Sequence, residues 1–315
     1  METNSDKHWY VVQVHFMTES VRKMIEGMPV KTYVPILKPA EPIEAPKKKG
    51  TVRRDVPARP TMLTFNYAFF YGTEKEVKDA VSPYSKMHML YYRKDNSKDI
   101  QQGRHIYRDY MIVRDKQMEM FMKTVSLYSN GAPIADVDTS KLSKGDHVLI
   151  TDGPFAGVEG TLVTQKGKDG GKVVVSIDGV VNVSTLDIEP QYIKVLKFAS
   201  DNKHIYKKLD SFQPFIQDVL KRKLEGKGLS EEEQSRIEMF VRRFSGAETE
   251  SLNMRARLTT LVFMSYVALG FEEHSLEYYK TLRDDILPQL KSPRAKTLIE
   301  EQFEVYAKLH ANNNF

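Results

Sequence analysis

A run of very short strand-like segments, separated by glycine turns, most tightly limits what this chain can fold into. Between residues 144 and 197, alternating valine and isoleucine residues are interrupted by Gly-Pro, Lys-Asp-Gly-Gly and Asp-Gly sequences. Strands this short bury enough apolar surface only if their sheet curls on itself. The spacing therefore predicts a small closed β-barrel over residues 144–198.

The part of the chain before this barrel, residues 8–130, alternates strand and helix signals. Residues 8–16 and 61–71 are rich in aromatic and β-branched side chains, which favour strands. Residues 18–27 carry a helix start and a helix stop, and apolar residues at helical spacing follow Asp115. This order of elements predicts a small α+β sandwich.

After the barrel, apolar residues return at helical spacing to the end of the chain. Pro214 predicts a kink or a restart in the first of these helices. Ser230-Glu-Glu-Glu is a capping-box sequence, Gly270 ends a long apolar stripe, and Ser292-Pro293 is a typical helix start. The pattern predicts an all-α domain over residues 200–311. No fixed-length repeat supports a helical solenoid.

Composition and charge limit the number of domains, the types of site and the cellular location that can be expected. The chain has 315 residues, a net charge of +5 and no cysteine, so we expect two or three domains without disulfides or thiolate metal sites. Basic and acidic residues are equal in number after residue 200, so the excess positive charge lies in the front part, where any nucleic-acid contact is expected. The polar start and the absence of a long apolar run predict a cytoplasmic protein without a membrane partner.

Signals for catalysis are absent from the sequence. The eight histidines are scattered, without the compact spacing of a metal site. Residues 167–172, Gly-Lys-Asp-Gly-Gly-Lys, lack the frame and the following Ser or Thr of a phosphate-binding loop. We therefore expect no enzyme activity, no metal and no cofactor. An active site in the helical domain stays open as an alternative, and it requires a cleft with convergent polar groups.

The glycine-turn segment also carries a recognisable motif. Residues 144–160 are Lys-Gly-Asp-His-Val-Leu-Ile-Thr-Asp-Gly-Pro-Phe-Ala-Gly-Val-Glu-Gly. Its glycines occupy places where a side chain clashes or φ is positive, and Phe155 can fold back as an apolar plug. The segment resembles the KOW motif of NusG-type elongation factors and several ribosomal proteins, whose barrel is SH3-like. The motif residues are Gly145, Asp146, Gly153, Pro154, Phe155, Gly157 and Gly160.

The first domain resembles the N-terminal domain of NusG-type factors. The resemblance is carried by Trp9-Tyr-Val-Val, by Phe65-Asn-Tyr-Ala-Phe-Phe and by Tyr110-Met-Ile-Val-Arg-Asp-Lys. Thr64 and Phe65 depart from the family pattern, in which a proline precedes the central strand. The resemblance covers residues 8–197 and implies a NusG-type domain over 8–130, a linker over 131–143, the KOW barrel over 144–198 and a helical domain of unknown role.

This resemblance implies a transcription elongation or antitermination regulator. Its first domain would bind the clamp helices of RNA polymerase, and its barrel would recruit a ribosome or a termination factor. The divergent residues and the added helical domain favour a specialised paralogue, of the kind that serves particular long operons. The helical domain is expected to pack on the other domains or to bind a protein of its own.

The resemblance also assigns two surfaces. Polymerase binding falls to Gln13, Asn66, Tyr67 and Phe69, although ordinary sandwich core accounts for the same residues. Contact with non-template DNA falls to a basic segment between the second and central strands, for which a solvated lysine loop is the competing interpretation. Its residues are Lys47, Lys48, Lys49, Arg53, Arg54 and Arg59.

A second alternative, besides an active site in the helical domain, concerns the partner of the KOW motif. KOW motifs also occur in ribosomal proteins, so the chain could be an RNA- or ribosome-binding protein without a polymerase contact. Copurifying partners would separate the two hypotheses, because polymerase subunits and ribosomal particles are readily distinguished.

Overall fold

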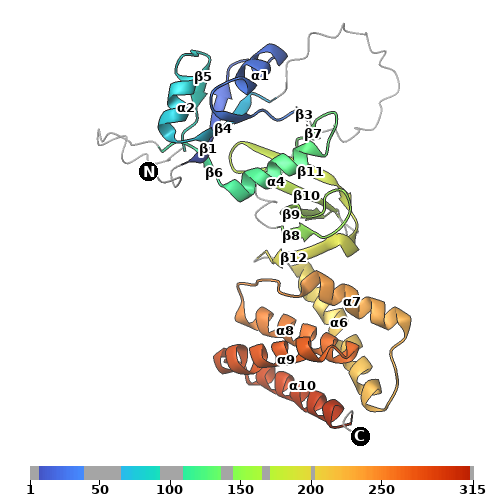
Figure 1. Ribbon diagram of the computed structural model, residues 1–315. Coiled ribbons are helices and arrows are strands. Elements are labelled where there is room, and N and C mark those ends of the chain that lie inside the picture. Colours follow the sequence, from blue (N-terminus) through green and yellow to red (C-terminus); the bar gives the residue numbers. More distant parts are fainter. Residues whose placement is uncertain are drawn as a thin grey trace, which may run out of the picture. The chain divides into compact units, whose positions relative to one another are not determined.

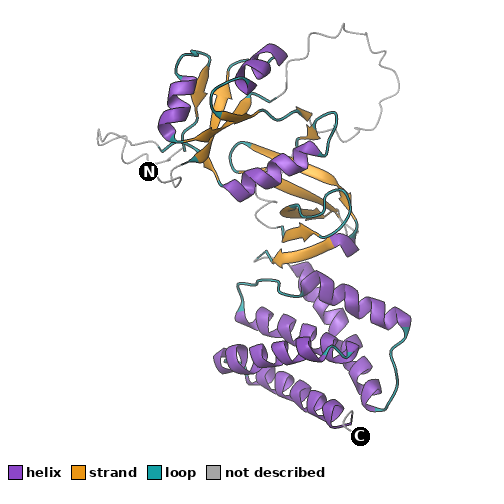
Figure 2. Cartoon of the chain, in the orientation of Figure 1, coloured by secondary structure: helices purple, strands orange, loops and turns teal. Residues whose placement is uncertain are grey.

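The computed structural model describes residues 7–38, 65–92, 109–135, 145–164, 171–199 and 203–312. It has mixed α and β content, with two larger sheets followed by a C-terminal helical region (Figures 1 and 2). No helix in these ranges is long and apolar enough to cross a membrane. The basic segment from Lys47 to Arg59 lies outside the described residues.

The chain divides into two compact units. One comprises Met1–Asp136 together with Val174–Thr185, and the other comprises Val137–Val173 together with Leu186–Phe315. The boundary falls within the segment in which the sequence predicts a separate barrel. The division into three modules therefore stays a prediction.

An antiparallel sheet forms the centre of the first unit. Its strand order is β2-β4-β1-β5, and β6 also pairs with β1. The strands are β1 (His8–Val14), β2 (Lys31–Tyr33), β4 (Tyr67–Gly72), β5 (Met87–Met89) and β6 (Ile112–Val113). A separate parallel pair joins β3 (Leu37–Lys38) to β7 (Ala132–Pro133), so the first residues of the predicted linker take part in strand pairing.

Helices α1 (Glu19–Glu26), α2 (Glu74–Val81) and α4 (Asp115–Ser126) complete this unit. Thr18 accepts a hydrogen bond from the Val21 N–H at the start of α1, and Thr73 forms a capping box at the start of α2. One face of the sheet, which includes Phe70, packs with Ile25 of α1 and Val77 of α2 in a single apolar cluster. Burial of this face fixes the register, because a one-residue slip would expose it.

The second sheet has the strand order β11-β10-β9-β8-β12. Described pairs β8–β9 and β8–β12 are antiparallel, and the short helix η2 (Pro190–Tyr192) precedes the last strand. The strands are β8 (His147–Ile150), β9 (Glu159–Thr164), β10 (Gly171–Ile177), β11 (Val181–Ile188) and β12 (Ile193–Lys197). The short strands predicted for residues 144–198 are thus present, and they form a five-stranded sheet.

The helical part of the second unit surrounds α8 (Leu252–Leu269), which is buried along most of its length. Around it lie α6 (Lys203–Leu224), α7 (Glu231–Phe244), α9 (Glu272–Lys280) and α10 (Pro293–Asn312). Between α9 and α10 the chain forms a π-helical turn, η3 (Thr281–Ile286), and a 3₁₀ turn, η4 (Leu287–Gln289). A helix that is apolar on every side needs neighbours on every side, so α8 is the natural centre of this bundle.

A short strand-like contact fastens this helical part to β12. The Phe198 N–H donates to the Glu248 carbonyl at 3.0 Å, and the Glu248 N–H donates to the Leu196 carbonyl at 2.8 Å. Rings of Phe198 and Phe244 stack with centroids 5.9 Å apart. Within the second unit, the segment between α7 and α8 therefore covers the open edge of β12, which would otherwise expose unpaired backbone groups.

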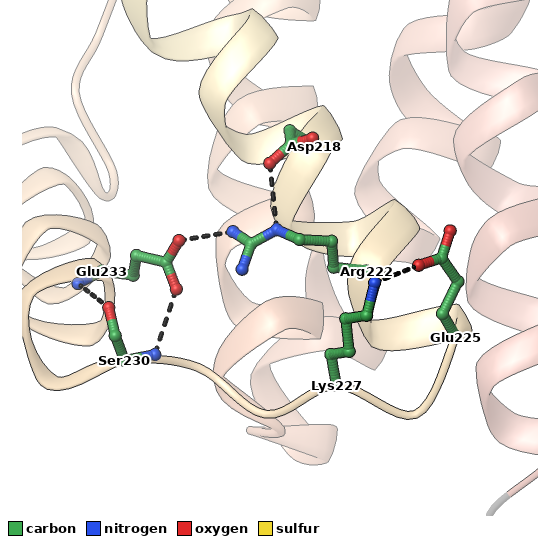
Figure 3. Close-up of polar contacts among 6 residues, drawn as sticks. All are labelled: Asp218, Arg222, Glu225, Lys227, Ser230 and Glu233. Atoms are coloured by element: carbon green, nitrogen blue, oxygen red, sulfur yellow. Dashed lines mark hydrogen bonds and ion pairs between the residues drawn. The ribbon is translucent and has the colours of Figure 1, made fainter.

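The turn between α6 and α7 is held by a charged cluster (Figure 3). Ser230 and Glu233 form the capping box expected from the sequence, with bonds of 3.2 and 3.0 Å to each other's backbone N–H. Arg222 reaches from α6 to both Glu233 and Asp218. The Arg222 hydrogen bond is the main reason that the pKa of Glu233 lies below its ordinary value, so this carboxylate is charged when it caps α7.

Candidate functional site

The predicted polymerase-binding residues lie along β1 and β4, whose register places Gln13 opposite Tyr67 and Val11 opposite Phe69. Residues opposite each other in an antiparallel pair share a face. Gln13, Tyr67 and Phe69 therefore share the face that does not contact α1 and α2. The structure places these three side chains on one face of the sheet, and Asn66 directly precedes β4.

Phe69 is completely buried on this face. Its ring meets the ring of Phe121 of α4 edge to face, with centroids 5.5 Å apart. The ring of Tyr33 lies 6.3 Å from the same Phe121 ring. Helix α4 thus covers the middle of the face. A partner could reach the Phe69 ring only if α4 moved.

The end of the same face remains accessible. Gln13, Asn66 and Tyr67 are partly exposed, and the Gln13 side chain contacts His88 Nε2 at 2.9 Å. Phe16, two residues beyond β1, is 50% exposed. Sequence reasoning missed Phe16; the available signal was an aromatic residue placed directly between a strand and the Thr18 helix cap. Gln13 and Tyr67 therefore form the accessible end of this face, and Phe16 and Asn66 are the accessible residues next to them along the chain; we call these four residues the sheet-end patch.

Helix α4 and the residues that follow it also contact β10 and β11, which belong to the same unit over residues 174–185. Gln117 donates a side-chain hydrogen bond to the Ser176 carbonyl at 2.6 Å, and the Tyr128 hydroxyl donates to the Ser184 carbonyl at 2.8 Å. Next to these bonds, the Ala135 N–H donates to the Asn182 carbonyl at 2.8 Å. The segment from α4 to Ala135 therefore contacts both the sheet that contains Phe69 and the strands β10 and β11 within this unit.

The bond from Tyr128 predicts a response to alkaline pH. Burial raises the pKa of Tyr128 to about 12, whereas a tyrosine in an unfolded chain titrates near about 10. Between these values the unfolded chain loses the proton and the folded chain keeps it, so the free energy of unfolding falls as pH rises. Urea unfolding across this range should show that decline. Tyr128→Phe should make it shallower, and Tyr84→Phe, at an exposed tyrosine, is the control that should not.

The motif residues of the second sheet occupy the turn between β8 and β9. Gly153 and Gly157 have φ of +81° and +78°, a region that costs other residues about 1–2 kcal/mol. The Gly157 N–H closes the turn by donating to the Ile150 carbonyl at 2.7 Å. Phe155 is buried at 4% exposure, as its expected role as an apolar plug requires, while Pro154 is exposed.

Three further motif residues lie in or beside the strands. Gly145 immediately precedes Asp146, whose carboxylate accepts a hydrogen bond from the Ala199 N–H at 3.0 Å. Gly160 is buried in β9 and pairs with Val148. The motif therefore shapes a turn and fixes the end of β12, and it presents no reactive group. The described residues also hold no group of three or more metal-ligating side chains.

Comparison with known proteins adds no relative to this description. A scan of the chain against protein-family models finds no match, and a search of curated proteins finds no match either. Function must therefore be argued from the sheet-end patch and from the motif turn.

Proposed function

We propose that this chain is a transcription elongation or antitermination regulator of the NusG type. Its first unit would bind the clamp helices of RNA polymerase, and its second sheet would bind another partner, a ribosome or a termination factor. The observation that carries the proposal is the succession of two features. An antiparallel sheet with flanking helices is followed by a five-stranded sheet whose first turn holds Phe155 between two glycines of positive φ.

The sheet-end patch supports the polymerase contact. Phe16 and Tyr67 supply partly exposed rings, and Gln13 and Asn66 supply amide groups beside them. Aromatic side chains dominate the energy of many protein interfaces, and a helical partner is recognised through a few apolar anchors in a groove. Binding there would attach the factor to the polymerase without any chemical step, in line with the lack of a catalytic constellation in the sequence.

Affinity capture tests this proposal. Tagged full-length protein should retain RNA polymerase subunits from a lysate of its own organism, and Tyr67→Ala should weaken that retention about tenfold or more, the usual cost of losing an aromatic anchor. Tyr84→Ala removes another exposed tyrosine of the same unit and should leave retention unchanged. Circular dichroism must show that both variants fold. Equal retention by wild type and Tyr67→Ala would remove the patch from the interface.

The same experiment bears on the alternative, an RNA- or ribosome-binding protein. Burial of Phe69 under α4 favours that alternative, because it leaves a smaller aromatic surface than the sequence suggests. Recovery of ribosomal particles without polymerase subunits would support it. Recovery of polymerase subunits would support the polymerase-binding function instead.

A further inference from the structure

The helical part of the second unit contains an open cavity of about 540 Å³ between α6, α8 and α10. Its size lies within the usual range for small-molecule sites. Ala256 and Ile299 form an apolar floor, and polar groups come from all three helices, including the amides of Gln213 and Asn253. The sequence left open a cleft with convergent polar groups in the helical domain, and this cavity is such a cleft.

Two arginines line this cavity, and one of them is held in place. Arg257 of α8 uses Nη2 to contact Asp210 at 2.7 Å and Gln213 at 3.0 Å, both on α6. No contact recorded among the described residues occupies its Nη1 or Nε, so these donors stay available. A guanidinium fixed along one edge loses little side-chain entropy when it binds a ligand with another edge.

Arg294, in the first turn of α10, is exposed and lines the same cavity. It has no recorded ion pair or hydrogen bond within the described residues. Asn253, in the first turn of α8, also lines the cavity, so the positive ends of two helix dipoles add to the field of the arginines. Glu301 is the carboxylate on the lining, and it opposes an anion there.

We propose that this cavity binds a small phosphate-bearing molecule. Guanidinium groups match phosphate oxygens in planar, charge-assisted pairs, and the amides of Gln213 and Asn253 can bind the remaining polar groups of the ligand. Arg257 and Arg294 hold the phosphate, and Asp210 positions Arg257. This binding is independent of the proposed transcription function and involves no covalent step.

Pyrophosphate is the probe for this site, with inorganic phosphate as the smaller comparison. Titration calorimetry on the full chain should detect binding, and methyl resonances of Ala256 and Ala295 should shift in NMR spectra. Arg294→Met, which breaks no contact recorded among the described residues, should weaken binding about tenfold, as expected for a lost charged hydrogen bond. Glu301→Gln should strengthen it, because a repelling charge is removed.

Arg255→Met is the matched control. Arg255 is an exposed arginine on α8 that lines a different cavity. Its loss changes the net charge as much as the loss of Arg294 does, and it should leave pyrophosphate affinity within about twofold, the effect expected of a distant exposed charge. Equal weakening by Arg255→Met and Arg294→Met would mean that only overall charge matters, and the proposal would fail. It would also fail if neither methyl resonance moved.

Discussion

Phe263→Ala is expected to lower the unfolding free energy of the second unit by about 3–5 kcal/mol, the usual cost of removing a buried phenylalanine ring. Phe263 is 1% exposed in α8. Its ring meets Tyr306 at 5.4 Å, Phe303 at 6.0 Å and Tyr279 at 6.3 Å. These neighbours come from α9 and α10, so the substitution leaves a cavity at the point where three helices meet.

Urea unfolding followed by circular dichroism at 222 nm, where helices dominate the signal, measures this loss. Phe271→Ala is the control, since Phe271 directly follows α8, contacts the ring of Tyr266 and is 50% exposed. It should cost less than about 1 kcal/mol, as surface substitutions usually do. If the two variants were equally stable, α8 would not be the centre of the bundle.

Much of the local structure follows from short-range signals in the sequence. Ser230 with Glu233 forms a capping box, Gly270 ends α8 with φ of +78°, and Pro293 is the first residue of α10. Each of these signals acts through a bond or a dihedral angle within a few residues, so no distant contact is needed to interpret it. The central antiparallel sheet of the first unit was likewise predictable from its aromatic strands.

Prediction was weaker where packing overrides local preference. Pro214 predicts a kink or restart; the helix does not restart there, because α6 continues through Pro214 from Lys203 to Leu224. Phe212 and Ile216, on either side of Pro214, are buried, and their packing outweighs the backbone hydrogen bond that proline cannot make. Apolar residues continue at helical spacing after Gly270. The turn after Lys280 is a π-helix, which this spacing does not distinguish from an α-helix.

Prediction from the sequence was also incomplete for the sheet face that carries Gln13, Tyr67 and Phe69, because a distant helix covers part of it. Strand alternation correctly places Tyr67 and Phe69 on one face and Phe70 on the other. Alternation does not reveal whether helices cover one face or both, because that depends on where α4 packs, and α4 is more than forty residues away along the chain. The outcome is a face that is closed at Phe69 and open at Tyr67.

Two alanine substitutions on this face should therefore lower the stability of the first unit by very different amounts. Phe69→Ala is expected to destabilise the first unit by about 3–5 kcal/mol, because it removes a fully buried ring from its contact with Phe121. Tyr67→Ala is expected to cost much less stability, about 1 kcal/mol, since the ring is partly exposed and, among the described residues, makes a ring contact only with Phe65.

Urea unfolding of both variants, followed by the fluorescence of the single Trp9 in β1, measures the difference within the first unit. If Phe69→Ala proved as stable as Tyr67→Ala, the Phe69 ring would have to be free in solution, and α4 could not cover it as the structure has it. A large difference in stability between the two variants would mean that a Phe69 variant loses polymerase capture because it unfolds, whether or not Phe69 contacts the polymerase. Only Tyr67 and its neighbours at the sheet end could then test docking, because there a lost contact with a partner does not also open the core.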